Sequence, residues 1–253
     1  MYKYNVSTKT KSMKTDVKGK WALVTGANRG IGYRVTKFMA SQGCNLILHS
    51  RNLEHTQKVL EEVKAMGVEA YCVAAELSNP TEVEKMIQEI KGKGTQVDLL
   101  FNNAAVQIAY RTEYFSTPVE DYATSFYINT IAPMMLCYAF VPDMIKRGFG
   151  RVVNTTSGIK NEPQQAGYSA SKAALDKVTT DLAGTVDGTD VIISLADPGW
   201  CRTDLGGPKA PNDPDSTIPG MVLGAFVNDK KSGRLFSAQE YAGLTLDEAL
   251  AKL

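Results

Sequence analysis

The stretch WALVTGANRGIG, residues 21–32, decides the fold of this chain. Its apolar start, Trp21 to Thr25, stops at a glycine-rich segment and so predicts a short buried strand. The next residues, Ile31 to Gln42, have helical spacing. Glycines let the connecting backbone turn tightly, and a helix start presents free N–H groups and a positive dipole end, which suit a pyrophosphate. Because the glycine spacing is Gly-x-x-x-Gly-x-Gly, a turn with a capped helix and no ligand is the alternative.

Short apolar runs alternate with helical stretches along the rest of the chain. Strands are expected at Asn45–His49, Ala70–Ala74, Val97–Phe101, Arg151–Thr155, Val191–Leu195 and near Phe236. Helices are expected at Leu53–Met66, Pro80–Lys91, Pro118–Arg147 with kinks at Pro133 and Pro142, and Tyr168–Thr185. The alternation predicts one doubly wound, Rossmann-type α/β domain, with a parallel sheet of about seven strands and helices on both faces.

Composition and charge narrow the class of protein. The 253 residues suit one large domain, residues 19–253, after a flexible basic tail, residues 1–18. The net charge of +1 gives no reason to expect nucleic acid, and no run reaches the ~20 apolar residues of a membrane span. Four scattered cysteines and two histidines predict no metal site. We therefore expect a cytoplasmic protein with reduced thiols and no nucleic-acid, membrane or metal partner.

Tyr168 and Lys172 stand four residues apart in an expected helix, which places both side chains on one helix face. A nearby cation favours the phenolate and lowers the pKa of a phenol, so the pair predicts an acid that works near neutral pH. Ser157 precedes the pair. Taken singly, Tyr168 could simply pack its helix, Lys172 could be solvated, and Ser157 could be a turn residue.

Several motifs then follow one another in a specific order. They are residues 25–32, Asn102-Asn103-Ala104-Ala105, Asn129, Ser157, Tyr168, Lys172, Pro198-Gly199 and Thr203. In this order they resemble the short-chain dehydrogenase/reductase family, over nearly the whole chain. Residues 198–208 are particularly similar to its carbonyl-reductase-like members.

The resemblance implies an NADPH-dependent oxidoreductase that reduces a carbonyl to an alcohol, reversibly, by hydride transfer. Tyr168 would be the general acid/base, and Lys172 would lower its pKa and hold the nicotinamide ribose. Ser157 would bind the substrate oxygen, and Asn129 would support a water chain that supplies protons. The loop between Ser157 and Tyr168 is shorter than in most members, and the hydroxyl of Thr156 is an alternative to that of Ser157.

The choice of cofactor rests on the end of the second expected strand. NAD-using folds usually have an acid there to bind the ribose hydroxyls. This chain has Ser50 followed by Arg51, and Arg29 lies in the glycine loop. Two arginines suit a 2′-phosphate, so NADPH/NADP+ is expected rather than NAD, with solvated surface arginines as the alternative.

The resemblance and the glycine loop together give a set of expected cofactor-binding residues. Glu76 and Ala105 stand in it where the family usually has Asp and Gly. The set is Gly26, Asn28, Arg29, Gly30, Ile31, Gly32, Ser50, Arg51, Glu76, Leu77, Asn103, Ala104, Ala105, Tyr168, Lys172, Pro198, Gly199, Trp200 and Thr203.

The substrate is expected to be a small carbonyl or alcohol under a loop at about residues 200–219, which is dense in Gly, Pro and Asp. Expected pocket residues are Gln107, Ile159, Gln164, Trp200 and Leu205. A homodimer or homotetramer is expected through the long helix, with Met134, Met135 and Tyr138 exposed; a plain core stripe is the alternative. Two alternatives stay open: a non-catalytic dinucleotide-binding regulator, and a ketoacyl-carrier-protein reductase with Arg111, Lys160 and Arg202 as a basic patch.

Overall fold

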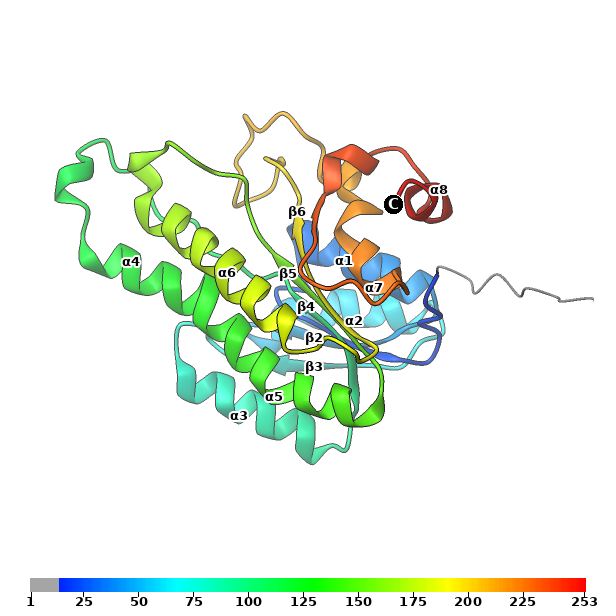
Figure 1. Cartoon of the computed structure of the whole chain (residues 1–253). Coiled ribbons are helices and arrows are strands. Elements are labelled where there is room, and N and C mark those ends of the chain that lie inside the picture. The colour runs from blue at the N-terminus through cyan, green and yellow to red at the C-terminus, as the bar shows by residue number, and fades with distance from the viewer. Residues whose placement is uncertain (1–13) are drawn as a thin grey trace, which may run out of the picture.

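The computed structural model describes residues 14–253, shown in Figure 1. Seven strands form one sheet in the order β3-β2-β1-β4-β5-β6-β7. All neighbouring strands are parallel. The strands are β1 (Trp21–Val24), β2 (Asn45–Ser50), β3 (Ala70–Ala74), β4 (Val97–Asn102), β5 (Gly150–Thr155), β6 (Val191–Asp197) and β7 (Leu235–Ser237). The predicted Rossmann-type fold is confirmed.

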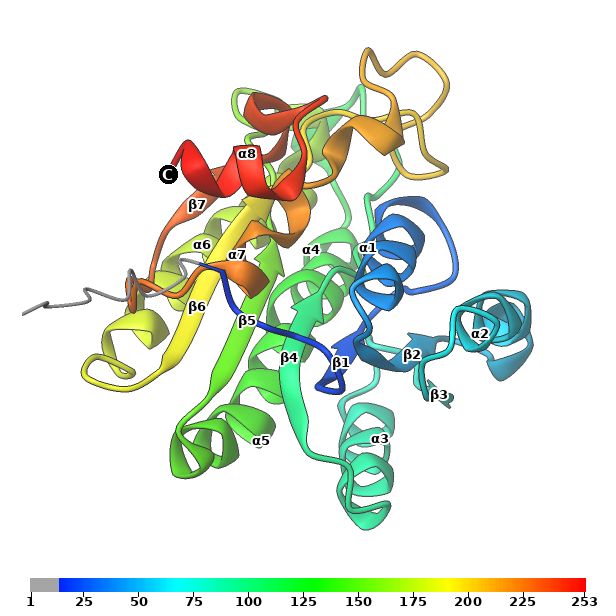
Figure 2. The same cartoon turned by 90° about the vertical axis from the view of Figure 1, so that its right-hand side faces the viewer.

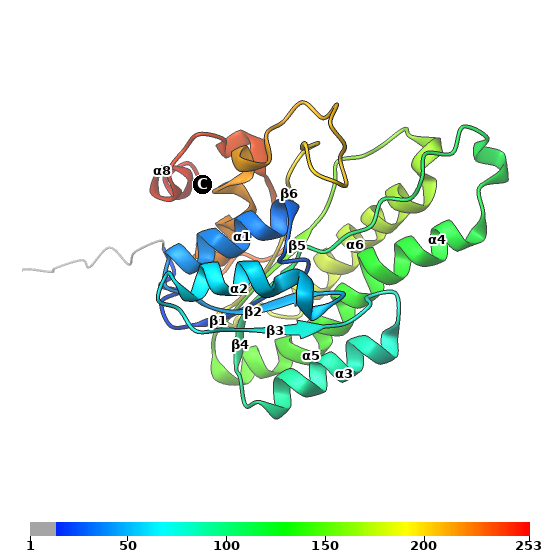
Figure 3. The ribbon, with the colours of Figure 1, turned by 180° about the vertical axis from the view of Figure 1, so that it is seen from behind.

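Helices cover both faces of the sheet, as Figures 1 and 3 show from opposite sides. One face carries α1 (Gly30–Ser41), α2 (Gln57–Lys64), α7 (Leu223–Phe226) and α8 (Leu246–Ala251). The other carries α3 (Pro80–Gly92), α5 (Ala132–Arg147) and α6 (Ala166–Gly184), and α4 (Val119–Phe126) packs on α6. Short 3-10 turns lie at Leu53–Thr56, Tyr114–Ser116, Pro163–Gln165, Pro214–Thr217, Gly220–Val222 and Ala238–Tyr241.

The strands are apolar runs because helices bury both of their faces. In β5, for example, every residue is buried. The chain changes direction across the sheet at β1, which pairs with β2 on one side and with β4 on the other. In open parallel sheets, such a switch point leaves a crevice at the carboxyl ends of the strands.

The long apolar segment expected at 118–147 is one continuous helical run. It consists of α4, a π-helical turn at Tyr127–Ile131 and α5, and Pro142 lies inside α5 without ending it. By length and composition the run Val119–Arg147 could cross a membrane, contrary to the sequence expectation. Its most apolar 18-residue window is 56% buried in the protein, and α5 packs on the sheet and on α3.

The expected flexible tail is partly wrong. Residues 1–13 lie outside the described residues, but 14–18 pack on the domain. Thr15 donates its backbone N–H to the Phe226 carbonyl at 2.7 Å, and Val17 is buried in the core. This packing explains why apolar Val17 stands in an otherwise polar segment.

Arg151 is the largest fully buried side chain. Its guanidinium donates to the carbonyls of Gly150, Asp190 and Val227, and pairs with the Asp190 carboxylate at 3.0 Å. It also donates to the Thr15 hydroxyl at 3.3 Å. Arg151 therefore joins the start of β5 to the N-terminal segment and to the turn after α7.

We expect Arg151→Met to lower the free energy of unfolding by about 3 kcal/mol, because the substitution leaves several buried acceptors without a donor. Urea denaturation followed by circular dichroism measures the change. Lys177→Met is the matched control, since it removes only the exposed pair with Asp181 and should cost less than about 1 kcal/mol. Equal losses in the two variants would contradict the structural role of Arg151.

Candidate active site

The motif residues meet at the carboxyl ends of β1, β4, β5 and β6. In Figure 2 the strand arrows point towards this edge, and the segment 200–219, drawn in gold, lies beyond it. Thr25 ties two of the loops together. Its hydroxyl accepts from the backbone N–H groups of Asn103 and Ala104, both at 3.0 Å. The Asn103 amide in turn donates to the Thr25 carbonyl at 3.1 Å.

The glycine loop needs its glycines. Gly26 and Gly30 have φ of 65° and 56°, a conformation that side chains rarely adopt. A Cβ on Gly32 would stand 2.1 Å from the Gly26 carbonyl oxygen. No side chain caps the N-terminus of α1, where Arg29 is the N-cap. An uncapped helix start behind a tight glycine turn fits the pyrophosphate of a dinucleotide.

His49 supports this loop, and sequence reasoning missed it. The side chain is buried at the end of β2. Nδ1 accepts from the Gly26 backbone N–H at 3.3 Å, and Nε2 faces the Ala75 carbonyl at 3.0 Å, which requires the neutral tautomer with hydrogen on Nε2. Burial lowers the pKa of His49 to about 4. A polar residue in an apolar strand was the available signal.

The Ser157 side chain lies close enough to Tyr168 to act on the pKa of its phenol. Tyr168 lies in the first turn of α6 and is 7% exposed, and Ser157 follows β5 by two residues. Burial raises the pKa of Tyr168; the Ser157 side chain opposes this shift, and the Asp197 carboxylate adds to it. The expectation that Lys172 lowers the pKa of Tyr168 is therefore not met, because desolvation dominates.

Lys172 lies one turn after Tyr168 and is buried. Its Nζ donates to the Thr155 carbonyl at 2.7 Å and lies 5.9 Å from the centre of the Tyr168 ring. Burial lowers the pKa of Lys172 to about 8, while the carboxylates of Asp176 and Asp197 act in the opposite direction. The ammonium thus stays mostly protonated at neutral pH.

Asn129 sits in the π-helical turn ahead of Pro133. Its amide donates to the Val106 carbonyl at 2.9 Å and to the Ser171 hydroxyl at 3.0 Å, and its oxygen accepts from the Val106 N–H at 2.9 Å. Asn129 therefore joins the loop after β4 to α6, next to Lys172. A π-helical turn is frequent at functional sites.

The residues expected to bind the adenosine half of the cofactor lie around the ends of β2 and β3, and their exposure to solvent differs. Arg51 is exposed, and Arg29 pairs with Asp204 at 2.8 Å. Ser50 is buried and donates its hydroxyl to the Asn52 carbonyl. The Leu77 side chain belongs to the core, so only its backbone is available to a ligand.

The segment after β6 closes over the glycine loop. Thr203 packs near Gly30, whose added Cβ would lie 3.6 Å from the Thr203 methyl. The Trp200 indole donates to the Gly206 carbonyl at 2.8 Å, yet its side chain is exposed. Leu205 is exposed as well.

The other expected pocket residues lie on two loops. Gln107 is in the loop after β4, and Ile159 and Gln164 are in the segment between Ser157 and Tyr168. Gln107 and Ile159 are half-buried. The side-chain oxygen of Gln164 is buried without a hydrogen-bond partner.

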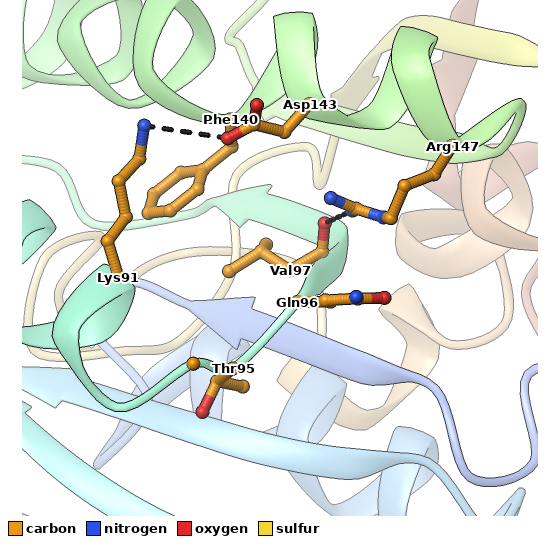
Figure 4. A pocket seen from close by; sticks show the side chains of 8 residues that line it. Lys91, Thr95, Gln96, Val97, Phe140, Asp143 and Arg147 are labelled. Carbon is orange, nitrogen blue, oxygen red and sulfur yellow. Dashed lines mark hydrogen bonds and ion pairs between the residues drawn. The ribbon is translucent and has the colours of Figure 1, made fainter.

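A separate cavity lies at the opposite edge of the sheet (Figure 4). It has a volume of about 250 Å³ and is lined by residues 94–97, Lys91, Phe140, Asp143 and Arg147. Lys91 pairs with Asp143 at 3.5 Å, and Arg147 donates to the Val97 carbonyl at 2.7 Å. None of the motif residues lines it. Within residues 14–253, no cluster of three or more acidic, histidine or cysteine side chains could hold a metal ion.

The fold defines a Rossmann-type α/β protein with a glycine-rich loop at the carboxyl ends of its strands. The family model described as short chain dehydrogenase matches residues 20–214, and the chain belongs to this family. A short chain dehydrogenase of Pseudocercospora fijiensis is 30% identical over 76% of this chain and 63% of its own length. A 3-oxoacyl-[acyl-carrier-protein] reductase of Synechocystis sp. is 32% identical over 73% of this chain and 75% of its own.

A solved structure agrees with this family assignment. A metagenomic short-chain oxidoreductase in complex with NADP has a TM-score of 0.70 and 30% identity, and the match covers 80% of this chain and 88% of that one.

The His49 geometry predicts a specific loss of stability in acid. The pKa of His49 is lower in the folded state, about 4, than in the unfolded chain, about 6.5, so the unfolded state binds the extra proton first. The contribution of neutral His49 to the free energy of unfolding is complete above pH 6.5 and is lost as the pH falls towards 4. Between pH 7 and pH 5, wild type should lose about 2 kcal/mol more than His49→Gln. Urea titrations at both pH values measure this, and parallel losses would contradict it.

Proposed function

We propose that this protein is an NADPH-dependent oxidoreductase that reduces a carbonyl substrate to an alcohol. The observation that carries the proposal is the position of Tyr168, one helical turn before the buried ammonium of Lys172 and close enough to Ser157 for that side chain to act on its phenol. The three groups lie at the same sheet edge as the uncapped glycine loop. A regulator that only binds a dinucleotide would need the loop but not these three groups.

In this proposal a bound reduced nicotinamide supplies the hydride. The Ser157 hydroxyl donates a hydrogen bond to the substrate oxygen, where negative charge develops. The Tyr168 hydroxyl then gives its proton to that oxygen. Because burial keeps the pKa of Tyr168 high, the phenol is protonated at neutral pH and is available as the acid. Lys172 places a positive charge beside the phenolate that forms.

The cofactor preference follows from charge. Arg51 is exposed at the end of β2, and no acid stands there to bind ribose hydroxyls. Arg29 lies at the start of α1 and is held at the surface by Asp204. Both guanidinium groups could pair with a 2′-phosphate. The 30% identical structure in complex with NADP supports the same choice.

The ketoacyl-carrier-protein reductase remains the second candidate because of the 32% identical relative from Synechocystis. Its acidic carrier would need a basic patch. Two of the three residues expected in that patch are already in ion pairs, Arg111 with Asp121 at 2.7 Å and Arg202 with Asp213 at 3.1 Å. The third, Lys160, is exposed and shows no ion pair. This pairing favours a small carbonyl substrate.

Assembly and compartment are further parts of the proposal. Exposed apolar residues on the run from α4 to α5 include Val119, Tyr127, Ile131 and Tyr138. They support a homodimer or homotetramer through these helices; Met134, expected to be exposed there, is buried in the core. All four cysteines are free thiols, in keeping with a cytoplasmic location.

Tyr168→Phe should lower kcat for carbonyl reduction by at least about a hundredfold, because the acid is lost while the ring still packs. NADPH oxidation against a panel of ketones and aldehydes measures turnover, and quenching of protein fluorescence measures NADPH binding. Turnover that survives in the variant would refute Tyr168 as the acid. Tight NADPH binding by a wild type that reduces no carbonyl would favour the regulator.

Arg51→Asp should reverse the cofactor preference, raising KM for NADPH more than about tenfold and lowering that for NADH. The control is Lys58→Asp, which makes the same charge change on the exposed side of α2. Steady-state assays with both cofactors give the ratio of kcat/KM values. An unchanged ratio would show that Arg51 is a solvated surface residue.

A further inference from the structure

Asp197 is the last residue of β6 and joins two loops of the site. One carboxylate oxygen, Oδ2, accepts from the backbone N–H of Gly158 at 2.9 Å. The other, Oδ1, accepts from the backbone N–H of Gly199 at 2.9 Å. Strands β5 and β6 run side by side, with Thr155 opposite Ala196, so the loops leave the sheet together. Each oxygen of Asp197 thus holds a different loop.

The first of these loops carries Ser157, directly before Gly158. The room there is small, because a Cβ on Gly158 would stand 3.0 Å from the Asp197 Oδ2 atom. With the Gly158 N–H fixed, the Ser157 hydroxyl has a defined position against Tyr168.

The second loop runs from Pro198 to Thr203 and reaches the glycine loop at Gly30. Gly199 has a φ of 72°, which a side chain rarely adopts. The Gln239 amide supports the same turn by donating to the Pro198 carbonyl at 2.8 Å. Asp197 therefore connects the loop that carries Ser157 to the one that covers α1.

We propose that Asp197 is a positioning residue, which holds the Ser157 loop in register with the 198–203 segment. This inference rests on the proposed function. None of the motifs that carry the family resemblance includes Asp197, and two bonds to backbone N–H groups of separate loops give it a role that a solvated strand-end acid would not have.

The charge of Asp197 acts on several groups of the site. On α6 it raises the pKa values of Tyr168, Lys172 and Asp176. In the loop after β6 it raises that of Cys201. The groups that β5 and the loop after it present are neutral. Lys172 faces the Thr155 carbonyl, and Tyr168 faces the Ser157 hydroxyl. Removing the carboxylate should thus lower the pKa of Lys172, whose other acidic neighbour is Asp176.

The test separates position from charge. Asp197→Asn keeps the shape but removes the charge and one acceptor, whereas Asp197→Glu keeps the charge and moves the oxygens. Asp187→Asn removes an exposed charge elsewhere and is the control. The two readouts are kcat for carbonyl reduction and the titration midpoint of Lys172. The midpoint is followed by NMR of protein labelled with ¹³C at lysine Cε, with Lys172→Met to assign the resonance.

We expect kcat to fall roughly tenfold in both Asp197 variants, because the Ser157 hydroxyl loses its alignment. The Lys172 midpoint should move to lower pH by at least about 0.3 unit in Asp197→Asn, but stay near the wild-type value in Asp197→Glu and Asp187→Asn. A purely structural acid would lower kcat without moving the midpoint in Asp197→Asn, and that result would overturn the proposal.

The two readouts also distinguish this inference from the proposed function. A wild type that reduces no carbonyl refutes the proposed function, and the Lys172 midpoint then decides the role of Asp197 alone. If Asp197→Asn does not fold, Asp197→Glu still tests the positioning role: wild-type kcat in that variant would overturn it.

Discussion

The site depends on one buried ammonium. Lys172 is almost completely buried and its Nζ donates to the Thr155 carbonyl, at the end of a strand that is itself fully buried. Placing a cation there is costly unless it is bonded and faced by opposite charge. The carbonyl supplies the bond, and Asp176 and Asp197 supply the charge. Because Lys172 is fixed to the end of β5, helix α6 is fixed as well, and its first turn brings Tyr168 to Ser157.

Much of the fold could be predicted because its determinants are local. Apolar runs of strand length, separated by amphipathic stretches, indicate a parallel sheet covered on both faces. The errors concern residues whose environment depends on distant parts of the chain. Val17 lies in a polar segment, yet it is buried in a core that includes Phe226 and Val227. Met134 was expected on an exposed face with Tyr138, one turn further along α5, but only Tyr138 is exposed, whereas Met134 is buried in the core between α5 and the sheet.

The motif residues of the site could also be predicted, since each belongs to a short pattern with fixed spacing. His49 and Asp197 could not, because their partners are backbone groups of loops that are remote in sequence or have no side-chain signature. The two residues have the same physical role at opposite ends of the site. His49 accepts from the N–H of Gly26 in the cofactor loop, and Asp197 accepts from the N–H groups beside Ser157 and Pro198. A loop that turns at glycine has little conformational restriction of its own, so an acceptor outside the turn is needed to fix it.

The electrostatics of the pair Tyr168 and Lys172 bear on the direction of reaction. Burial raises the pKa of the phenol and lowers that of the ammonium, so desolvation favours the neutral form of both groups. The nearby carboxylate of Asp197 raises both pKa values, which keeps the phenol protonated and also restores the charge on Lys172. A protonated phenol beside a cation can give up its proton and have the resulting phenolate stabilised. Alcohol oxidation would instead start from the phenolate, so under the proposed function the protonated phenol is the acid for carbonyl reduction.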